Sequence, residues 1–158
     1  MKKLYFLFLI VLLPSCMATK STLLSYREYT AEKEFKSDKT KNDLFIAANA
    51  WLVESFSRAN NVIQFSDKEA GIIMGRYLMN GSYSTLSDNN VYAIITLKVK
   101  DNLTKIKIAP QGEAKYYPPK PDDNIKFTPI VLTPEQVKNM VKSTIDDYSL
   151  YITNYTNW

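Results

Sequence analysis

Two runs of alternating apolar and polar residues, separated by Asp101 and Asn102, constrain the fold of this chain more than any other feature of its sequence. Residues 91–100 and 103–109 follow the period of two that places successive side chains on opposite faces of a strand. An Asp-Asn pair between two such runs is typical of a two-residue hairpin turn. The pattern therefore predicts a long antiparallel hairpin.

The predicted hairpin has one apolar face and one basic face. The apolar face would carry Ala93, Ile95, Leu97, Val99, Thr104, Ile106 and Ile108, and the basic face Lys98, Lys100, Lys105 and Lys107. This one-sided pattern is typical of a strand pair that covers a core with one face and meets water with the other. The expected register places Lys98 opposite Lys105, a pairing of like charges that costs stability.

Two amphipathic segments predict two helices. The first spans residues 41–59 after an N-cap signal at Thr40, and its apolar stripe is Leu44, Ala48, Trp51, Leu52, Phe56 and Ala59. The second begins after Thr133-Pro134-Glu135-Gln136, a capping sequence with proline at the first helical position. Its stripe is Val137, Met140, Val141, Thr144, Ile145, Tyr148 and Ile152.

Shorter patterns complete the expected order of elements. Residues 26–35, 62–65 and 72–83 have strand character, residues 67–71 a turn, and residues 114–129 the composition of a stiff surface connection. Strand, helix, four strands and helix in this order predict an α+β domain of two layers. An antiparallel sheet would carry both helices on one face and leave its other face open.

Four segments in the middle of the chain resemble a known family. Residues 50–52, 62–65, 67–71 and 72–75 contain a helical tryptophan, a short strand, an acidic turn with glycine and a longer strand. They resemble bacterial lipoprotein domains described as a domain of unknown function with a TBP-like fold. The resemblance implies a β-α-β4-α fold and an envelope setting of the Bacteroidetes type. It implies no activity, and DNA binding does not follow from the shape of the fold.

The first sixteen residues predict a lipoprotein signal peptide, residues 1–15. Lys2 and Lys3 precede an apolar run at residues 4–13, which is too short to span a bilayer but suits a signal peptide. Leu13-Pro14-Ser15-Cys16 then resembles a lipobox, with Pro14 as a departure from the pattern. We expect cleavage before Cys16, followed by attachment of a diacylglycerol and an N-acyl lipid, which together hold a protein stably at a membrane. The alternative is a plain secreted protein whose cysteine lies near the cut by chance.

The expected mature chain consists of a lipidated tether at residues 16–25 and one domain at residues 26–158. Without Lys2 and Lys3, the 20 basic and 16 acidic residues become 18 and 16, a net charge of +2. So mild a charge does not indicate a nucleic-acid partner. No acidic residue follows closely after Cys16, which favours an outer-membrane location facing the periplasm.

The composition argues against catalysis and against a metal site. The chain has no histidine, and Cys16 is its one cysteine, so the usual nucleophile–base pairs and zinc ligand sets are missing. Asp146 and Asp147 are neighbours on the predicted second helix, where adjacent side chains point about 100° apart and do not form a dyad. Asp122 and Asp123 lie beside the proline cluster, which predicts a solvated loop. We expect no enzyme activity, no metal and no cofactor beyond the covalent lipid.

Two surfaces are candidates for binding. Lys98, Lys100, Lys105 and Lys107 could contact an anion, although a merely solvated face has the same composition. Tyr116, Tyr117, Pro118, Pro119 and Pro121 form a stiff aromatic segment that suits a contact loop, or a loop that packs across the sheet edge.

These expectations favour a lipid-anchored module that binds an envelope protein or an anionic glycan or lipid head group. One alternative is a periplasmic carrier of a small apolar ligand or lipid between helix and sheet, and another is an enzyme that uses carboxylates. A sizeable apolar cavity would favour the carrier, and a filled core would favour the binding module.

Overall fold

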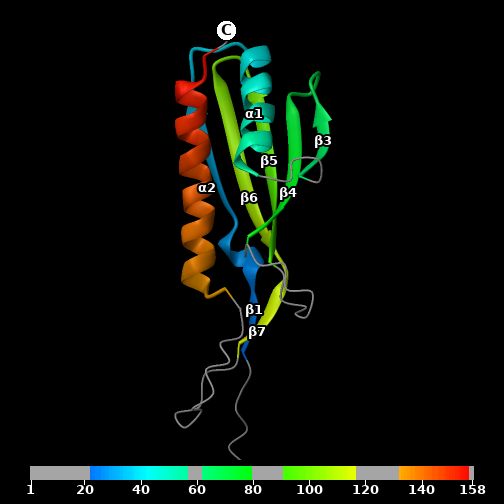
Figure 1. Ribbon diagram of the computed structural model, residues 1–158, viewed down its shortest axis with the longest axis vertical. Helices are drawn as coiled ribbons and strands as arrows, with labels where there is room; N and C mark the ends of the chain where they lie inside the picture. The colour runs from blue at the N-terminus through cyan, green and yellow to red at the C-terminus, as the bar shows by residue number, and fades with distance from the viewer. Residues whose placement is uncertain (1–21, 57–61, 80–90, 117–131, 157–158) are drawn as a thin grey trace, which may run out of the picture.

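A computed structural model describes residues 22–56, 62–79, 91–116 and 132–156, and these form a two-layer α+β structure. A five-stranded antiparallel sheet has the order β2-β6-β5-β4-β3. Its strands are β2 (Ala31–Lys36), β3 (Ile63–Asp67), β4 (Ile72–Leu78), β5 (Tyr92–Lys100) and β6 (Leu103–Gln111). Helices α1 (Lys41–Ser55) and α2 (Pro134–Asn154) both cover the same face of this sheet (Figure 1). The predicted fold class and the order β-α-β4-α are confirmed.

The β5–β6 hairpin has the register expected from the sequence. Lys98 pairs with Lys105 and Lys100 with Leu103, so the turn consists of Asp101 and Asn102. Asn102 takes a positive φ of 63°, a conformation that asparagine tolerates better than most residues. The Asp101 carboxylate accepts a hydrogen bond of 2.7 Å from the backbone N–H of Lys41, which ties the turn to the start of α1.

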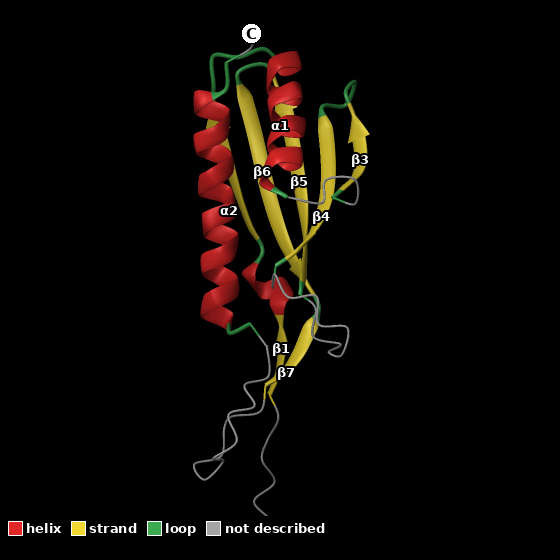
Figure 2. Ribbon diagram, in the orientation of Figure 1, coloured by secondary structure: helices red, strands yellow, loops and turns green. Residues whose placement is uncertain are grey.

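The N-terminal part of the domain differs from the sequence prediction. Strand β1 (Thr22–Ser25) lies within the expected tether, and it pairs antiparallel with β7 (Glu113–Tyr116) in a separate two-stranded sheet (Figure 2). A 3-10 helix, η1 (Tyr26–Tyr29), replaces the first part of the expected strand at residues 26–35. Tyr26 is buried and donates a hydrogen bond of 2.9 Å from its hydroxyl to the backbone oxygen of Leu132. This buried anchor turns the chain between β1 and β2.

The ends of α1 and β6 also differ from the sequence prediction, each for a physical reason. Helix α1 ends at Ser55 because Phe56 is extended, which lets its ring pack against Trp51 and Tyr77 with centroids 5.6 and 4.6 Å away. Strand β6 continues through Pro110. A proline is tolerated there because the pairing with β2 stops at Ile108, so no strand pairs with Pro110 on the β2 side.

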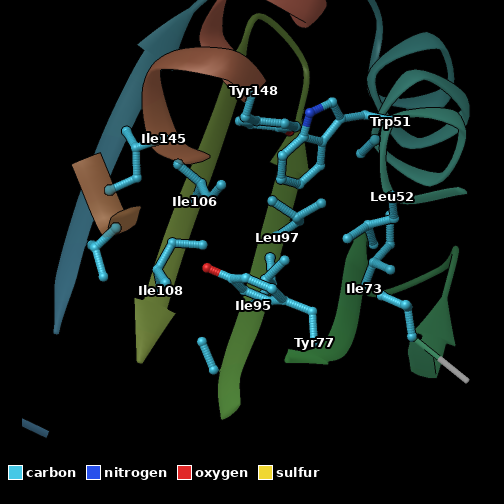
Figure 3. Close-up of a cluster of buried hydrophobic side chains, with 14 of the residues drawn as sticks. Trp51, Leu52, Ile73, Tyr77, Ile95, Leu97, Ile106, Ile108, Ile145 and Tyr148 are labelled. Carbon is cyan, nitrogen blue, oxygen red and sulfur yellow. The ribbon is translucent and has the colours of Figure 1, made fainter. Parts of the chain in front are cut away.

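The core lies between the two helices and the sheet, and large side chains fill it. Trp51 from α1 and Tyr148 from α2 lie together over the sheet residues Leu97 and Ile106, and all four have no exposed surface (Figure 3). The Trp51 and Tyr148 rings meet edge to face with centroids 4.8 Å apart. Helix α2 begins with the predicted capping box between Thr133 and Gln136. In the described ranges, no helix combines the length and apolarity needed to cross a membrane.

Candidate interaction surface

The face of the five-stranded sheet opposite the helices is not covered by any element within the described residues (Figure 1). Register and strand alternation assign its side chains. They are Glu32, Glu34 and Lys36 on β2; Leu103, Lys105, Lys107, Ala109 and Gln111 on β6; Tyr92, Ile94, Thr96, Lys98 and Lys100 on β5; Ile72, Met74, Arg76 and Leu78 on β4; and Phe65 and Asp67 on β3. We call this surface the open face.

The four predicted lysines lie together on the open face. Lys98, Lys100 and Lys107 are exposed, whereas Lys105 is about one-third exposed. Their positions on two paired strands follow the expected register, with Lys107 opposite Thr96 in the middle of the sheet. The sheet therefore gathers these positive charges on one side of the molecule.

Two glutamates on β2 partly neutralise this basic surface, and the sequence did not place them there. The Lys105 ammonium lies 2.8 Å from a carboxylate oxygen of Glu32 and 3.6 Å from one of Glu34. The hydrogen bond from Lys105 lowers the pKa of the Glu32 carboxyl and, reciprocally, raises the pKa of the Lys105 ammonium. Lys105 is therefore paired with carboxylates of the protein itself, while Lys98, Lys100 and Lys107 form no ion pair with another described residue.

The other half of the open face is less polar. Ile72 and Met74 are half-buried neighbours on the open side of β4, and Ile94 is half-buried diagonally across from Met74 on β5. The Phe65 ring, opposite Met74 on edge strand β3, is 48% exposed. Arg76 stacks over the ring of Tyr92 at 3.9 Å from its centroid, a cation–π contact. The open face thus carries lysines on β5 and β6 next to an apolar group formed by Phe65, Ile72, Met74 and Ile94 from β3, β4 and β5. The charged residues Arg76 and Asp67 lie beside that group.

Part of the predicted proline–tyrosine segment falls on strand β7. Tyr116 is the last residue of β7, so residues 114–116 pair with β1 instead of starting a loop. Gly112 precedes β7 with a positive φ of 107°, which lets the chain leave β6 and form this second sheet. Tyr117, Pro118, Pro119 and Pro121 lie outside the described residues, as do Asp122, Asp123 and Cys16.

The adjacent carboxylates of α2 have separate structural partners. Asp146 pairs with Lys142 one turn earlier and lies 3.9 Å from the Lys33 ammonium, and the Lys142 contact lowers the pKa of its carboxyl. Asp147 accepts hydrogen bonds from Trp51 Nε1 at 2.8 Å and from Ser55 Oγ at 3.3 Å. Each carboxylate therefore joins α2 to a different neighbour.

A buried polar pair joins α2 to the sheet. Thr104, which the sequence placed on the apolar face, shares a hydrogen bond with the hydroxyl of Tyr148, and both residues are fully buried. Burial raises the pKa of the Tyr148 phenol, which therefore remains neutral. The sequence offered two signals of this buried pair, a threonine among apolar residues and a tyrosine in a helical stripe. It could not show that the two residues pair, because the pairing depends on how α2 packs on β6.

Three hollows lined by described residues open at the protein surface. One of about 660 Å³ lies between α2 and edge strand β2, with Tyr29, Val141 and Ile145 below a charged rim. Another of about 440 Å³ lies near the end of α2, where Tyr151 and Tyr155 stack with centroids 5.8 Å apart. No group of three or more His, Cys, Asp or Glu side chains within the described ranges is placed to hold a metal ion.

Comparison with known proteins gives a family and two similar structures. A family model described as a domain of unknown function (DUF4468) with TBP-like fold matches residues 29–110. A DUF4468 family protein from Bacteroides ovatus is 17% identical with a TM-score of 0.52, over 82% of this chain and 88% of its own. A TBP-like protein from Parabacteroides distasonis is 15% identical with a TM-score of 0.51, over 80% and 94% of the two chains. A search of curated proteins found no match.

Proposed function

Because the chain belongs to the DUF4468 family of domains with a TBP-like fold, a membership that brings no known activity, we propose that it is a lipid-anchored binding module of the bacterial cell envelope. It acts without catalysis, and its ligand is an envelope protein or an anionic surface polymer. The observation that carries this proposal is the open face, on which charged and apolar side chains lie together without cover from the helices.

The composition of the open face supports binding. A solvated sheet face needs polar side chains, but this one also keeps Ile72, Met74 and Ile94 together next to an exposed Phe65. Apolar side chains that lie beside unpaired charges are typical of contact surfaces, in which an apolar centre adjoins a polar rim. The open face therefore offers both affinity through apolar contact and selectivity through charge.

The packing of the core supports a binding module over the carrier. Trp51, Tyr148, Leu97 and Ile106 occupy the space between helix and sheet where a helix–sheet carrier would hold its ligand (Figure 3). Replacing such side chains by a ligand would require large repacking, because protein interiors are close-packed. Within the described residues, the surface that could contact a ligand therefore lies on the outside of the protein and not between the helices and the sheet.

A photo-crosslinking experiment tests the use of the open face. Thr96 is half-buried at the centre of the open face, and a photoreactive amino acid there would lie within reach of a bound partner. We expect ultraviolet irradiation of intact cells to give a discrete adduct from position 96. The same amino acid at Lys138, an exposed residue of α2, is the control and should give none.

Digestion of the adduct with protease or with glycan-degrading enzymes then identifies its class. Equal adducts from positions 96 and 138 would contradict the proposal, because they would show that no particular face is used. The absence of any adduct at position 96, with the domain folded by circular dichroism, would also contradict it.

A further inference from the structure

We propose that the hollow near the end of α2 is a second binding site, which takes an arginine side chain of a partner protein. Within the described residues, this hollow is lined by Glu54 of α1, by the last two turns of α2, and by Tyr155 and Thr156. Because both helices lie on one side of the sheet, the hollow is on the opposite side from the open face (Figure 1). The inference therefore goes beyond the proposed function, and neither site requires the other.

The hollow is negatively charged. Glu54 and Asp147 line it, and its described lining contains no lysine or arginine. The other two hollows are each lined by at least two lysines. The chain has more basic than acidic residues, so a hollow without a positive side chain is a local feature and not a result of the composition. Charge complementarity indicates a cationic occupant.

Both carboxylates are oriented by the protein and keep acceptor capacity. Trp51 Nε1 and Ser55 Oγ both donate to the same oxygen of Asp147, Oδ2, so Oδ1 has no donor among the described residues. The Tyr151 hydroxyl donates to Glu54. Burial, this hydrogen bond and the charge of Glu54 raise the pKa of Tyr151 to about 12, so the phenol remains a donor at neutral pH. An ionised carboxylate has about four acceptor positions, so each can also accept N–H groups of a guanidinium.

The aromatic and apolar side chains of the hollow favour arginine over lysine. The rings of Tyr151 and Tyr155 stack with centroids 5.8 Å apart, and Leu150 in the same lining is 63% exposed. A planar guanidinium can stack on a tyrosine ring while its N–H groups donate to carboxylates, and its aliphatic stem can pack on an apolar side chain. The lysine ammonium is a compact, strongly hydrated charge without such a plane. Arg76 already makes this contact within the protein, 3.9 Å from the centroid of the Tyr92 ring.

An NMR titration of the full chain in a neutral detergent, with isotope-labelled tyrosine, tests the site. The probes are the N-acetyl amides of arginine, lysine and citrulline, and citrulline has the shape of arginine without its charge. We expect the arginine amide to shift the Tyr151 and Tyr155 signals with a Kd on the order of 1 mM, since one side chain makes few contacts. The lysine amide should bind at least about threefold more weakly, which corresponds to the loss of one exposed stacking contact. The citrulline amide should cause no shift.

Two pairs of variants test the residues of the site. Glu54→Gln should weaken binding of the arginine amide about two- to fivefold, the range of one exposed ion pair, whereas Glu135→Gln, at an exposed carboxylate in the first turn of α2, should leave it unchanged. Tyr155→Leu should weaken binding about two- to fivefold, whereas Tyr155→Phe keeps the ring and should retain binding. The Tyr151 signal reports binding in both Tyr155 variants, and circular dichroism establishes that every variant is folded.

Four results would overturn the inference. No shift of Tyr151 or Tyr155 at about tenfold the expected Kd would show that the hollow binds no arginine. Equal binding of the arginine and lysine amides would show that only charge matters. Equal losses in Glu54→Gln and Glu135→Gln would show that only the net charge of the protein matters. Shifts caused by methyl glucoside but not by the arginine amide would replace the partner protein by a glycan.

Failure of this site and failure of the proposed function are distinguishable. The Thr96 adduct reports contacts at the open face, so it would still form if the arginine amide did not bind to the hollow. The control position Lys138 lies about 20 Å along α2 from Tyr151, so it is outside this site as well.

Discussion

Replacing Trp51 by alanine should lower the free energy of unfolding by about 3–5 kcal/mol, the usual cost of truncating a large buried aromatic side chain. Trp51 has no exposed surface, and its ring contacts Tyr148 from α2 and Phe56 after α1. Its indole N–H also donates to Asp147. The substitution therefore removes the contact that joins both helices over the sheet. Urea unfolding followed by circular dichroism at 222 nm measures the loss.

Two milder variants separate packing from hydrogen bonding. Trp51→Phe keeps a ring but loses the indole N–H, and we expect it to cost about 1–2 kcal/mol. Asp147→Asn keeps the shape of the acceptor and should cost about 1 kcal/mol or less, since Asp147 is exposed and water can hydrate it. If Trp51→Ala cost less than Asp147→Asn, the central position of Trp51 in the core would be contradicted.

The hairpin and the second helix could be predicted because their signals are local. A period of two over residues 91–109 fixes which side chains share a face, and Asp101-Asn102 fixes the register between the two strands. The capping box at Thr133 likewise lies within four residues. Such features need no knowledge of distant contacts, so the sequence and the structure agree on them.

The N-terminal sheet could not be predicted because its two short strands lie far apart in the sequence. Strands β1 and β7 are only four residues each, and Ser25 pairs with Glu113 from the other end of the sheet region. Neither strand is long enough to show a regular alternation of apolar and polar residues that could be recognised alone. Tyr26 looked like the start of a strand, but its hydroxyl bonds to Leu132, more than 100 residues later. Long-range contacts of this kind produce no periodic pattern in the sequence from which they could be predicted.

The candidate surface was only partly predictable for the same physical reason. The lysines of β5 and β6 followed from the hairpin register, because both strands are adjacent in sequence. The carboxylates of Glu32 and Glu34 reach Lys105 only because β2 pairs with β6 across α1 and three strands of intervening chain. A strand that alternates Glu, Lys, Glu and Phe is also a charged edge, which discourages pairing with another sheet. Which lysine it neutralises depends on the topology.

Replacing Cys16 by serine should abolish attachment of fatty acid to the protein, an all-or-none effect. In the proposed anchor the Cys16 sulfur carries a diacylglycerol and its freed amine a third acyl chain. A serine hydroxyl is a far weaker nucleophile than a cysteine thiolate at neutral pH, so the first alkylation would fail. Because burial of each CH₂ contributes about 0.8 kcal/mol, two or three chains bind a membrane far more strongly than one. Metabolic labelling with palmitate, followed by mass spectrometry of the N-terminal peptide, measures the attachment.

Two matched variants distinguish a lipobox from a cysteine that lies near a cut by chance. Cys16→Ser combined with Thr19→Cys restores a cysteine three residues further on and should remain unlabelled, because the expected enzyme recognises the cysteine next to Leu13-Pro14-Ser15. Pro14→Ala replaces the one departure from the pattern by a small residue, and we expect labelling at least as strong as in the native chain. A native chain whose mature N-terminus starts elsewhere, or a Cys16→Ser chain that still takes up palmitate, would contradict the anchor. The open face would then have to reach its partner from a protein that is free to diffuse in its compartment.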